Sequence, residues 1–250
     1  MAVTFHIVKN IPLKKPILIE GFPGMGLVGT ISASYLVDKL NMDFIGYITS
    51  DRFPPLAAIH KHQPMYPARL YASKKHNLIV LLSEFIVPIR AVYELSDAIY
   101  DFAKKKKVSQ IISLGAIVQK GDDRKIFAVA SIPSLQKKFD DDPRIQLVGE
   151  GVTTGVTGVL LARGALDKFP VVSFLAQANA DYMDPMASVT VLETLKDYVG
   201  IRVDTSSLKD EAHDVEAKMK DMLSKAKQTQ DHYHKTTRDG MSDDFGAMYG

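Results

Sequence analysis

Short apolar runs alternate with helix-like segments along residues 16 to 200 of this chain. The segments between the runs have apolar residues three and four positions apart, which is the spacing of amphipathic helices. Strands are predicted at residues 16–20, 44–48, 70–72, 78–82, 110–114, 126–130 and 171–175. Helices are predicted at residues 27–40, 89–107, 158–166 and 185–199. This alternation favours an α/β fold in which a mostly parallel sheet lies between helices on both faces, as three layers.

Composition narrows the class of protein. The 250 residues have a formal net charge of +2 and are 46% hydrophobic, which argues against a nucleic-acid binder with a broad basic face. The absence of cysteine excludes disulfides, thiolate zinc sites and cysteine nucleophiles. No apolar run approaches the roughly 20 residues of a membrane span, and residues 1–6 do not resemble a signal peptide. We therefore expect a cytoplasmic protein with neither membranes nor nucleic acids as partners.

The pattern changes after residue 204. Apolar residues then recur at the three- and four-residue spacings of a coiled-coil seam. The seam residues are Leu208, Ala212, Val215, Met219, Met222 and Ala226, and the candidate oligomerisation contacts are Leu208, Val215, Met219, Met222 and Ala226. Residues beyond this seam are polar, as in segments without a fixed fold. We predict an α/β domain at 1–204, an amphipathic oligomerisation helix at 205–228 and a flexible tail at 229–250.

A glycine-rich loop follows the first predicted strand and opens the first predicted helix. Gly24, Gly26 and Gly29 fit the G-x-G-x-x-G pattern of dinucleotide-binding folds. That pattern also requires an acidic residue at the end of the second strand, where Asp43 comes too early and Asp51 too late. Two interpretations stay open: a nucleotide-binding α/β enzyme that uses the Gly24–Gly29 loop, or a tight turn that packs a helix closely on a sheet.

Other candidate sites are weaker. The glycine and threonine loop at residues 149–158 could bind an anion through backbone amides, but such loops more often cap a helix. His60 and His62 are close in sequence, as are His232 and His234, yet neither pair has the further ligands that a metal site needs. No G-x-S-x-G nucleophile motif occurs. We expect no catalytic residues, no cofactor and no metal.

Four segments together resemble the archaeal branch of the proteasome assembly chaperone family, which is related to the second eukaryotic assembly chaperone. They are residues 19–29 (IEGFPGMGLVG), 51–55 (DRFPP), the loop at 149–158, and 184–188 (DPMAS). The resemblance extends over about residues 10 to 200 and implies a fold similar to nucleoside phosphorylases. It also implies a protein that is not an enzyme, that acts on proteasome core particles, and whose glycine loop is architectural.

The sequence ends in Met248-Tyr249-Gly250. This ending resembles the hydrophobic-tyrosine-any residue motif of ATP-independent proteasome activators, which inserts between adjacent α-ring subunits and opens the gate. The resemblance implies that Met248 makes an apolar contact, that Tyr249 is the anchor, and that the Gly250 carboxylate pairs with a lysine. The resemblance to archaeal relatives of the activator type implies that this chain forms a homotetramer. The sequence leaves open whether the chain activates or assembles the proteasome, and whether unfolded proteins are further partners.

Overall fold

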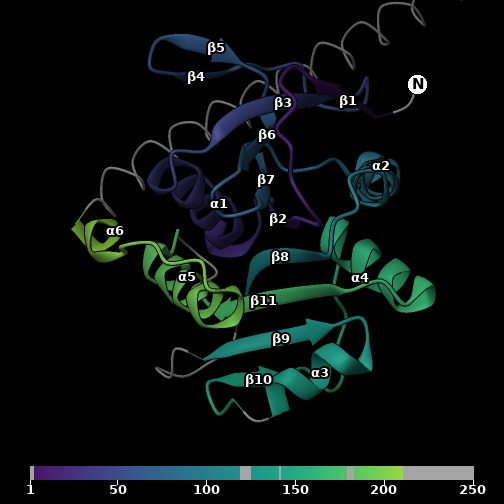
Figure 1. Ribbon diagram of the computed structural model, residues 1–250, viewed down its shortest axis with the longest axis vertical. Helices are drawn as coiled ribbons and strands as arrows, with labels where there is room; N and C mark the ends of the chain where they lie inside the picture. Colours follow the sequence, from purple (N-terminus) through teal and green to yellow (C-terminus); the bar gives the residue numbers. More distant parts are fainter. Residues whose placement is uncertain (1–2, 119–124, 141, 179–182, 211–250) are drawn as a thin grey trace, which may run out of the picture.

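A computed structural model describes residues 3–118, 125–140, 142–178 and 183–210. Figure 1 shows a central sheet with helices on either side. The nine strands are ordered β1-β3-β6-β7-β2-β8-β11-β9-β10. Their bounds are β1 Thr4–Ile7, β2 Ile17–Gly21, β3 Asp43–Thr49, β6 Ala68–Ser73, β7 Leu78–Ser83, β8 Gln110–Ile117, β9 Ile126–Ala130, β10 Ile145–Leu147 and β11 Val171–Gln177. A separate hairpin is formed by β4 (Ala58–His60) and β5 (Gln63–Met65).

The helices occupy the connections between these strands. They are α1 Val28–Lys39, α2 Val92–Lys105, α3 Pro133–Asp140, α4 Gly155–Asp167, α5 Pro185–Val199 and the short α6 Ser206–Asp210. Single 3₁₀ turns, η1 (Met25–Leu27) and η2 (Ile89–Ala91), precede α1 and α2. The strands and helices predicted between residues 16 and 199 are all present. Of the helix predicted at 205–228, α6 occupies Ser206–Asp210, and the rest lies outside the described residues. The sequence did not predict β1, β4, β5, β10 or α3, most of which are too short to show a periodic pattern.

The centre of the sheet is parallel. Strands β7, β2, β8 and β11 run in one direction, and antiparallel pairs flank them on both sides. The central strands are apolar on both faces because helices cover both, as the α/β prediction required. Helices α1 and α5 pack over one face with Ile19 and Ile112, whereas α2 and α4 pack over the other with Leu18 and Ile111. The expected α/β fold is therefore confirmed.

The first helix approaches the sheet very closely. A Cβ atom built on Gly21 would lie 2.2 Å from the backbone oxygen of Gly29, and one built on Gly29 would lie 2.4 Å from the backbone oxygen of Leu114. Real Cβ atoms do not tolerate such distances to backbone. These two glycines therefore allow the start of α1 to rest directly on β2 and β8.

Among the described residues, no helix is both long enough and apolar enough to cross a membrane.

Replacing Gly29 should distort this contact. We expect Gly29→Ala to lower the free energy of unfolding by about 1–3 kcal/mol, the usual cost of forcing an extra carbon into a packed interior. Gly24→Ala is the matched control, because a Cβ there meets nothing within 4 Å and the residue has an extended φ of −150°. Urea denaturation of both variants measures the effect. Equal stabilities for the two variants would contradict the close-packing role of Gly29.

Candidate functional site

Three polar side chains lie in register across the central strands. Glu20 of β2 pairs with Ser113 of β8, and Ser113 pairs with Ser173 of β11. All three residues are fully buried. Because alternate residues of a strand share a face, they point to the same side as Leu18 and Ile111, under α2 and α4. We call Glu20, Ser113 and Ser173 the polar row.

Burial sets the protonation of Glu20. Loss of solvent raises the pKa of its carboxyl to about 7, and hydrogen bonds from Ser113 and Thr157 oppose that rise. Both hydroxyl groups donate to Oε1 of Glu20, Thr157 Oγ1 at 3.0 Å. The other carboxyl oxygen, Oε2, has no hydrogen-bond partner among the described atoms. Near neutral pH, Glu20 is thus balanced between its protonated and ionised forms.

A cleft of about 700 Å³ opens beside this row. We call it the β2–β8 cleft. It is bordered by residues 22–25, 86–87, 114–118 and 148–157, together with Val92, Val129, Ser173 and Leu175. Ser173 belongs to both the row and the cleft, and Thr157 links the cleft to Glu20. Both glycine-rich loops that the sequence singled out therefore border the same cleft.

The segments at 19–29 and 184–188 also meet in space. The backbone N–H of Asp184 donates to the carbonyl oxygen of Gly26 at 3.0 Å, and the Asp184 side chain caps α5 by accepting from the N–H of Ala187. Gly26 has a φ of +58°, which favours glycine. The DPMAS segment therefore joins the start of α5 to the glycine loop through these hydrogen bonds.

The structure gives little support to a dinucleotide site at Gly24–Gly29. Strand β3 runs parallel to β2, since two antiparallel pairings and one parallel pairing separate them. Asp43 begins β3, so it lies at the sheet edge opposite the glycine loop, where it pairs with Lys9. No lysine, arginine or histidine is among the described residues that line the β2–β8 cleft. A pyrophosphate would meet no cationic side chain from the described part of this wall.

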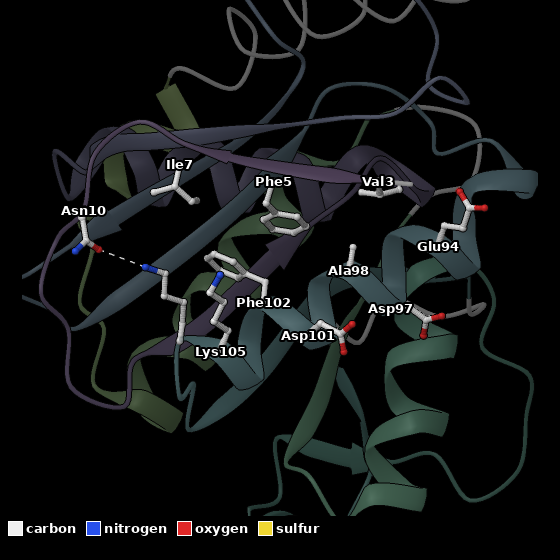
Figure 2. A pocket seen from close by; sticks show the side chains of 11 residues that line it. Val3, Phe5, Ile7, Asn10, Glu94, Asp97, Ala98, Asp101, Phe102 and Lys105 are labelled. Atoms are coloured by element: carbon white, nitrogen blue, oxygen red, sulfur yellow. Dashed lines mark hydrogen bonds between the residues drawn. The ribbon is translucent and has the colours of Figure 1, made fainter. Parts of the chain in front are cut away.

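A second hollow lies between β1 and α2 (Figure 2). Its volume is about 900 Å³, and the stacked rings of Phe5 and Phe102 lie at its apolar side, with centroids 4.8 Å apart. The acids along its rim already have partners, because Asp97 pairs with Arg163 and Glu94 with Arg52. One buried oxygen on this rim, Oε2 of Glu94, has no hydrogen-bond partner among the described atoms, although Oε1 of the same carboxylate pairs with Arg52.

His60 takes part in an ion-pair cluster instead of a metal site. The Nε2 atom of His60 and a guanidinium nitrogen of Arg69 lie 2.8 and 2.7 Å from Oε1 of Glu84. Burial raises the pKa of the Glu84 carboxyl, but the contacts with His60 and Arg69 outweigh it and lower that pKa overall. The cluster ties the β4–β5 hairpin to the sheet. Among the described residues, no group of three potential ligands could hold a metal.

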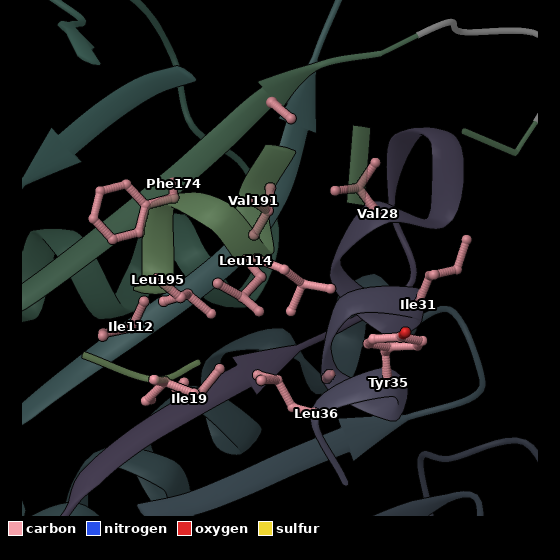
Figure 3. Packing of buried hydrophobic residues seen from close by; sticks show 14 of the residues in the cluster. Ile19, Val28, Ile31, Tyr35, Leu36, Ile112, Leu114, Phe174, Val191 and Leu195 are labelled. Carbon is pink, nitrogen blue, oxygen red and sulfur yellow. The ribbon is translucent and has the colours of Figure 1, made fainter. Parts of the chain in front are cut away.

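The residues predicted to bind partners fall mostly outside the described residues. This holds for Val215, Met219, Met222 and Ala226 of the seam and for the ending Met248-Tyr249-Gly250. Leu208, the first seam residue, is fully buried in the core cluster of α1 and α5, so its side chain is not available to a second copy. Nearby, the Tyr35 hydroxyl contacts Ser207 Oγ at 2.9 Å and donates to the Asp204 carbonyl at 2.7 Å. Tyr35 lies beside Ile31 in that core (Figure 3).

Comparison with known proteins gives consistent matches. A model of the PAC2 family matches residues 18–223. The uncharacterized protein MJ0106 of Methanocaldococcus jannaschii is 30% identical over 213 residues, which cover 85% of this chain and 87% of that protein.

Solved structures share the fold. Pyrococcus furiosus PbaA, described as an archaeal homolog of proteasome-assembly chaperone, has a TM-score of 0.80 and 27% identity, over 92% of this chain and 99% of PbaA. P. furiosus PbaB, described as an archaeal proteasome activator, has a TM-score of 0.74 over 88% of this chain and 98% of PbaB. At 22% identity, the likeness to PbaB shows the fold alone.

The pKa of Glu20 predicts a pH effect on stability. The native carboxyl keeps its proton up to about pH 7, whereas the ordinary value is 4.5, so the native state binds more protons between these values. Stability should therefore fall as pH rises through this window, by on the order of 3 kcal/mol. Glu20→Gln should remove that fall, since an amide can accept the same two hydroxyl hydrogen bonds.

Urea denaturation at several pH values between 4.5 and 8 measures this, as the difference between wild type and variant. Glu150→Gln is the control, because Glu150 is an exposed carboxyl beside the same cleft. Parallel stability curves for wild type and Glu20→Gln would show that Glu20 titrates normally.

Proposed function

The chain belongs to the PAC2 family, and from that membership we propose that it acts on proteasome core particles, as an assembly chaperone or an activator. The observation that carries the proposal is the family match over residues 18–223. The likeness to PbaA over nearly the whole of both chains supports it, because PbaA is described as a homolog of a proteasome-assembly chaperone. The proposal requires neither ATP nor a catalytic residue.

The contact with the core particle is proposed to lie in Met248-Tyr249-Gly250. A tyrosine supplies a large anchoring surface with few rotatable bonds, which is why aromatic residues dominate the energy of many interfaces. A terminal carboxylate adds a charge that a lysine or backbone amides can bind. In this scheme Tyr249 fills a pocket between adjacent α subunits, Met248 packs beside it, and the Gly250 carboxylate forms the ion pair. Insertion then opens the gate.

One such tail buries little surface and should bind weakly. Several tails on one oligomer would raise the overall affinity by roughly 10²–10⁴-fold without any new contact. The proposed seam between copies consists of Val215, Met219, Met222 and Ala226. Leu208 is left out of it because its side chain packs in the core of the same chain. We propose a homo-oligomer, with a tetramer as the expected number.

Removing the ending tests the tail directly. Deletion of residues 248–250, or Tyr249→Ala, should abolish stimulation of fluorogenic peptide hydrolysis by cognate core particles. Tyr233→Ala is the matched control, because Tyr233 is an aromatic residue of the same polar segment. Addition of two residues after Gly250 should also abolish stimulation, since it moves the carboxylate away from the anchor.

Stimulation that survives both changes would contradict the tail mechanism. Core-particle intermediates are purified from the same samples to separate the two roles. Accumulation of α-ring intermediates without a change in peptide hydrolysis would identify an assembly chaperone, and the converse would identify an activator.

A further inference from the structure

The β2–β8 cleft lies where the connections of the sheet diverge. The chain leaves β2 through η1 and α1 toward β3, on one side of the strand order, and it leaves β8 toward β9 and β11 on the other side. In open α/β sheets, the carboxyl ends of strands at such a point leave a crevice that commonly binds a ligand. The cleft volume of about 700 Å³ falls within the range of small-molecule sites.

Ser173 is an orphaned polar group at this crevice. Its side chain is 0% exposed and lines the cleft, and its Oγ has no hydrogen-bond partner among the described atoms. Oε2 of Glu20, in the same polar row, also has no hydrogen-bond partner among the described atoms. A buried hydroxyl without a partner is costly to keep, so two orphans in one row indicate that a further polar group completes it.

The cleft wall limits what that group can belong to. Most of the wall is apolar, and its side chains include Phe22, Val87, Leu114, Val129, Val156 and Leu175. Hydroxyl groups are supplied by Ser173 and the threonines of the 148–157 loop. The one ionisable side chain among the described lining residues is Glu150, and Glu20 lies behind Thr157. Among the described lining residues, an anion would therefore meet no cationic side chain and one like charge, that of Glu150, which disfavours its transfer from water.

We propose that the β2–β8 cleft binds a small uncharged molecule with an apolar ring and a hydrogen-bonding edge, such as an aryl amide, and that Ser173 and Thr157 contact that edge. The ring would pack against the valine and leucine side chains, and the edge would complete the polar row. The proposal requires neither the C-terminal residues nor the core particle, so it is independent of the proposed function.

A pair of isosteric probes tests the chemistry. Titration of the full chain with 4-fluorobenzamide and with 4-fluorobenzoate, followed by ¹⁹F line broadening, compares an uncharged edge with an anionic one. The amide should bind with a dissociation constant in the millimolar range expected for a fragment of about ten heavy atoms. The benzoate should bind at least tenfold more weakly.

Two variants locate the binding. Ser173→Ala should weaken amide binding about three- to tenfold, the usual effect of one lost hydrogen bond, while Ser32→Ala should not change it. Ser32 is the matched control, because it is a fully buried serine on α1 whose Oγ also has no partner among the described atoms. Leu175→Trp should fill the cleft and abolish binding, with retained helix content as the check on folding.

Equal binding of the two probes, no binding of the amide up to its solubility limit, or equal effects of Ser173→Ala and Ser32→Ala would each overturn the proposal. So would amide binding that persists in folded Leu175→Trp. A change in oligomeric state caused by Leu175→Trp, seen by sedimentation velocity, would also overturn it, because the cleft would then be an interface between copies of the chain.

Discussion

Helix α1 rests with its backbone directly on β2 and β8, since Gly21 and Gly29 have no side chains to separate them. This contact determines how the segments at the carboxyl end of β2 are arranged. It fixes the turn at Gly24–Leu27, where Gly26 accepts a hydrogen bond from Asp184 and so positions the start of α5. Helix α5 then packs along α1 over one face of the sheet. The loop pattern that resembles a dinucleotide-binding fingerprint thus has a sufficient mechanical explanation.

The same edge collects the four segments on which the family resemblance rested. Residues 19–29 and 184–188 meet through Gly26 and Asp184, and residues 149–158 border the β2–β8 cleft. The segment at 51–55 reaches the edge through Arg52, which donates to the Arg90 carbonyl of η2. Packing and hydrogen bonding can explain the identities of these residues in this chain. None of them needs to be catalytic for its identity to matter.

The sequence predicted the long elements well because their periodic apolar patterns reflect one buried face each. It could not predict the polar row, since only the pairing of β2, β8 and β11 places Glu20, Ser113 and Ser173 side by side. The one local signal was a glutamate at the end of the run Ile17-Leu18-Ile19. Leu208 was assigned to a seam between copies because spacing alone does not distinguish an intermolecular face from the chain's own core. The ending Met248-Tyr249-Gly250 remains a prediction from sequence.

The account separates a folded body, which belongs to the PAC2 family, from a short ending proposed to recognise the proteasome. Electron cryomicroscopy of the full chain bound to its cognate core particle tests that division most directly. The account predicts that Tyr249 occupies pockets between adjacent α subunits, with the Gly250 carboxylate beside a lysine. A complex in which the folded body makes the contact while those pockets stay empty would contradict it.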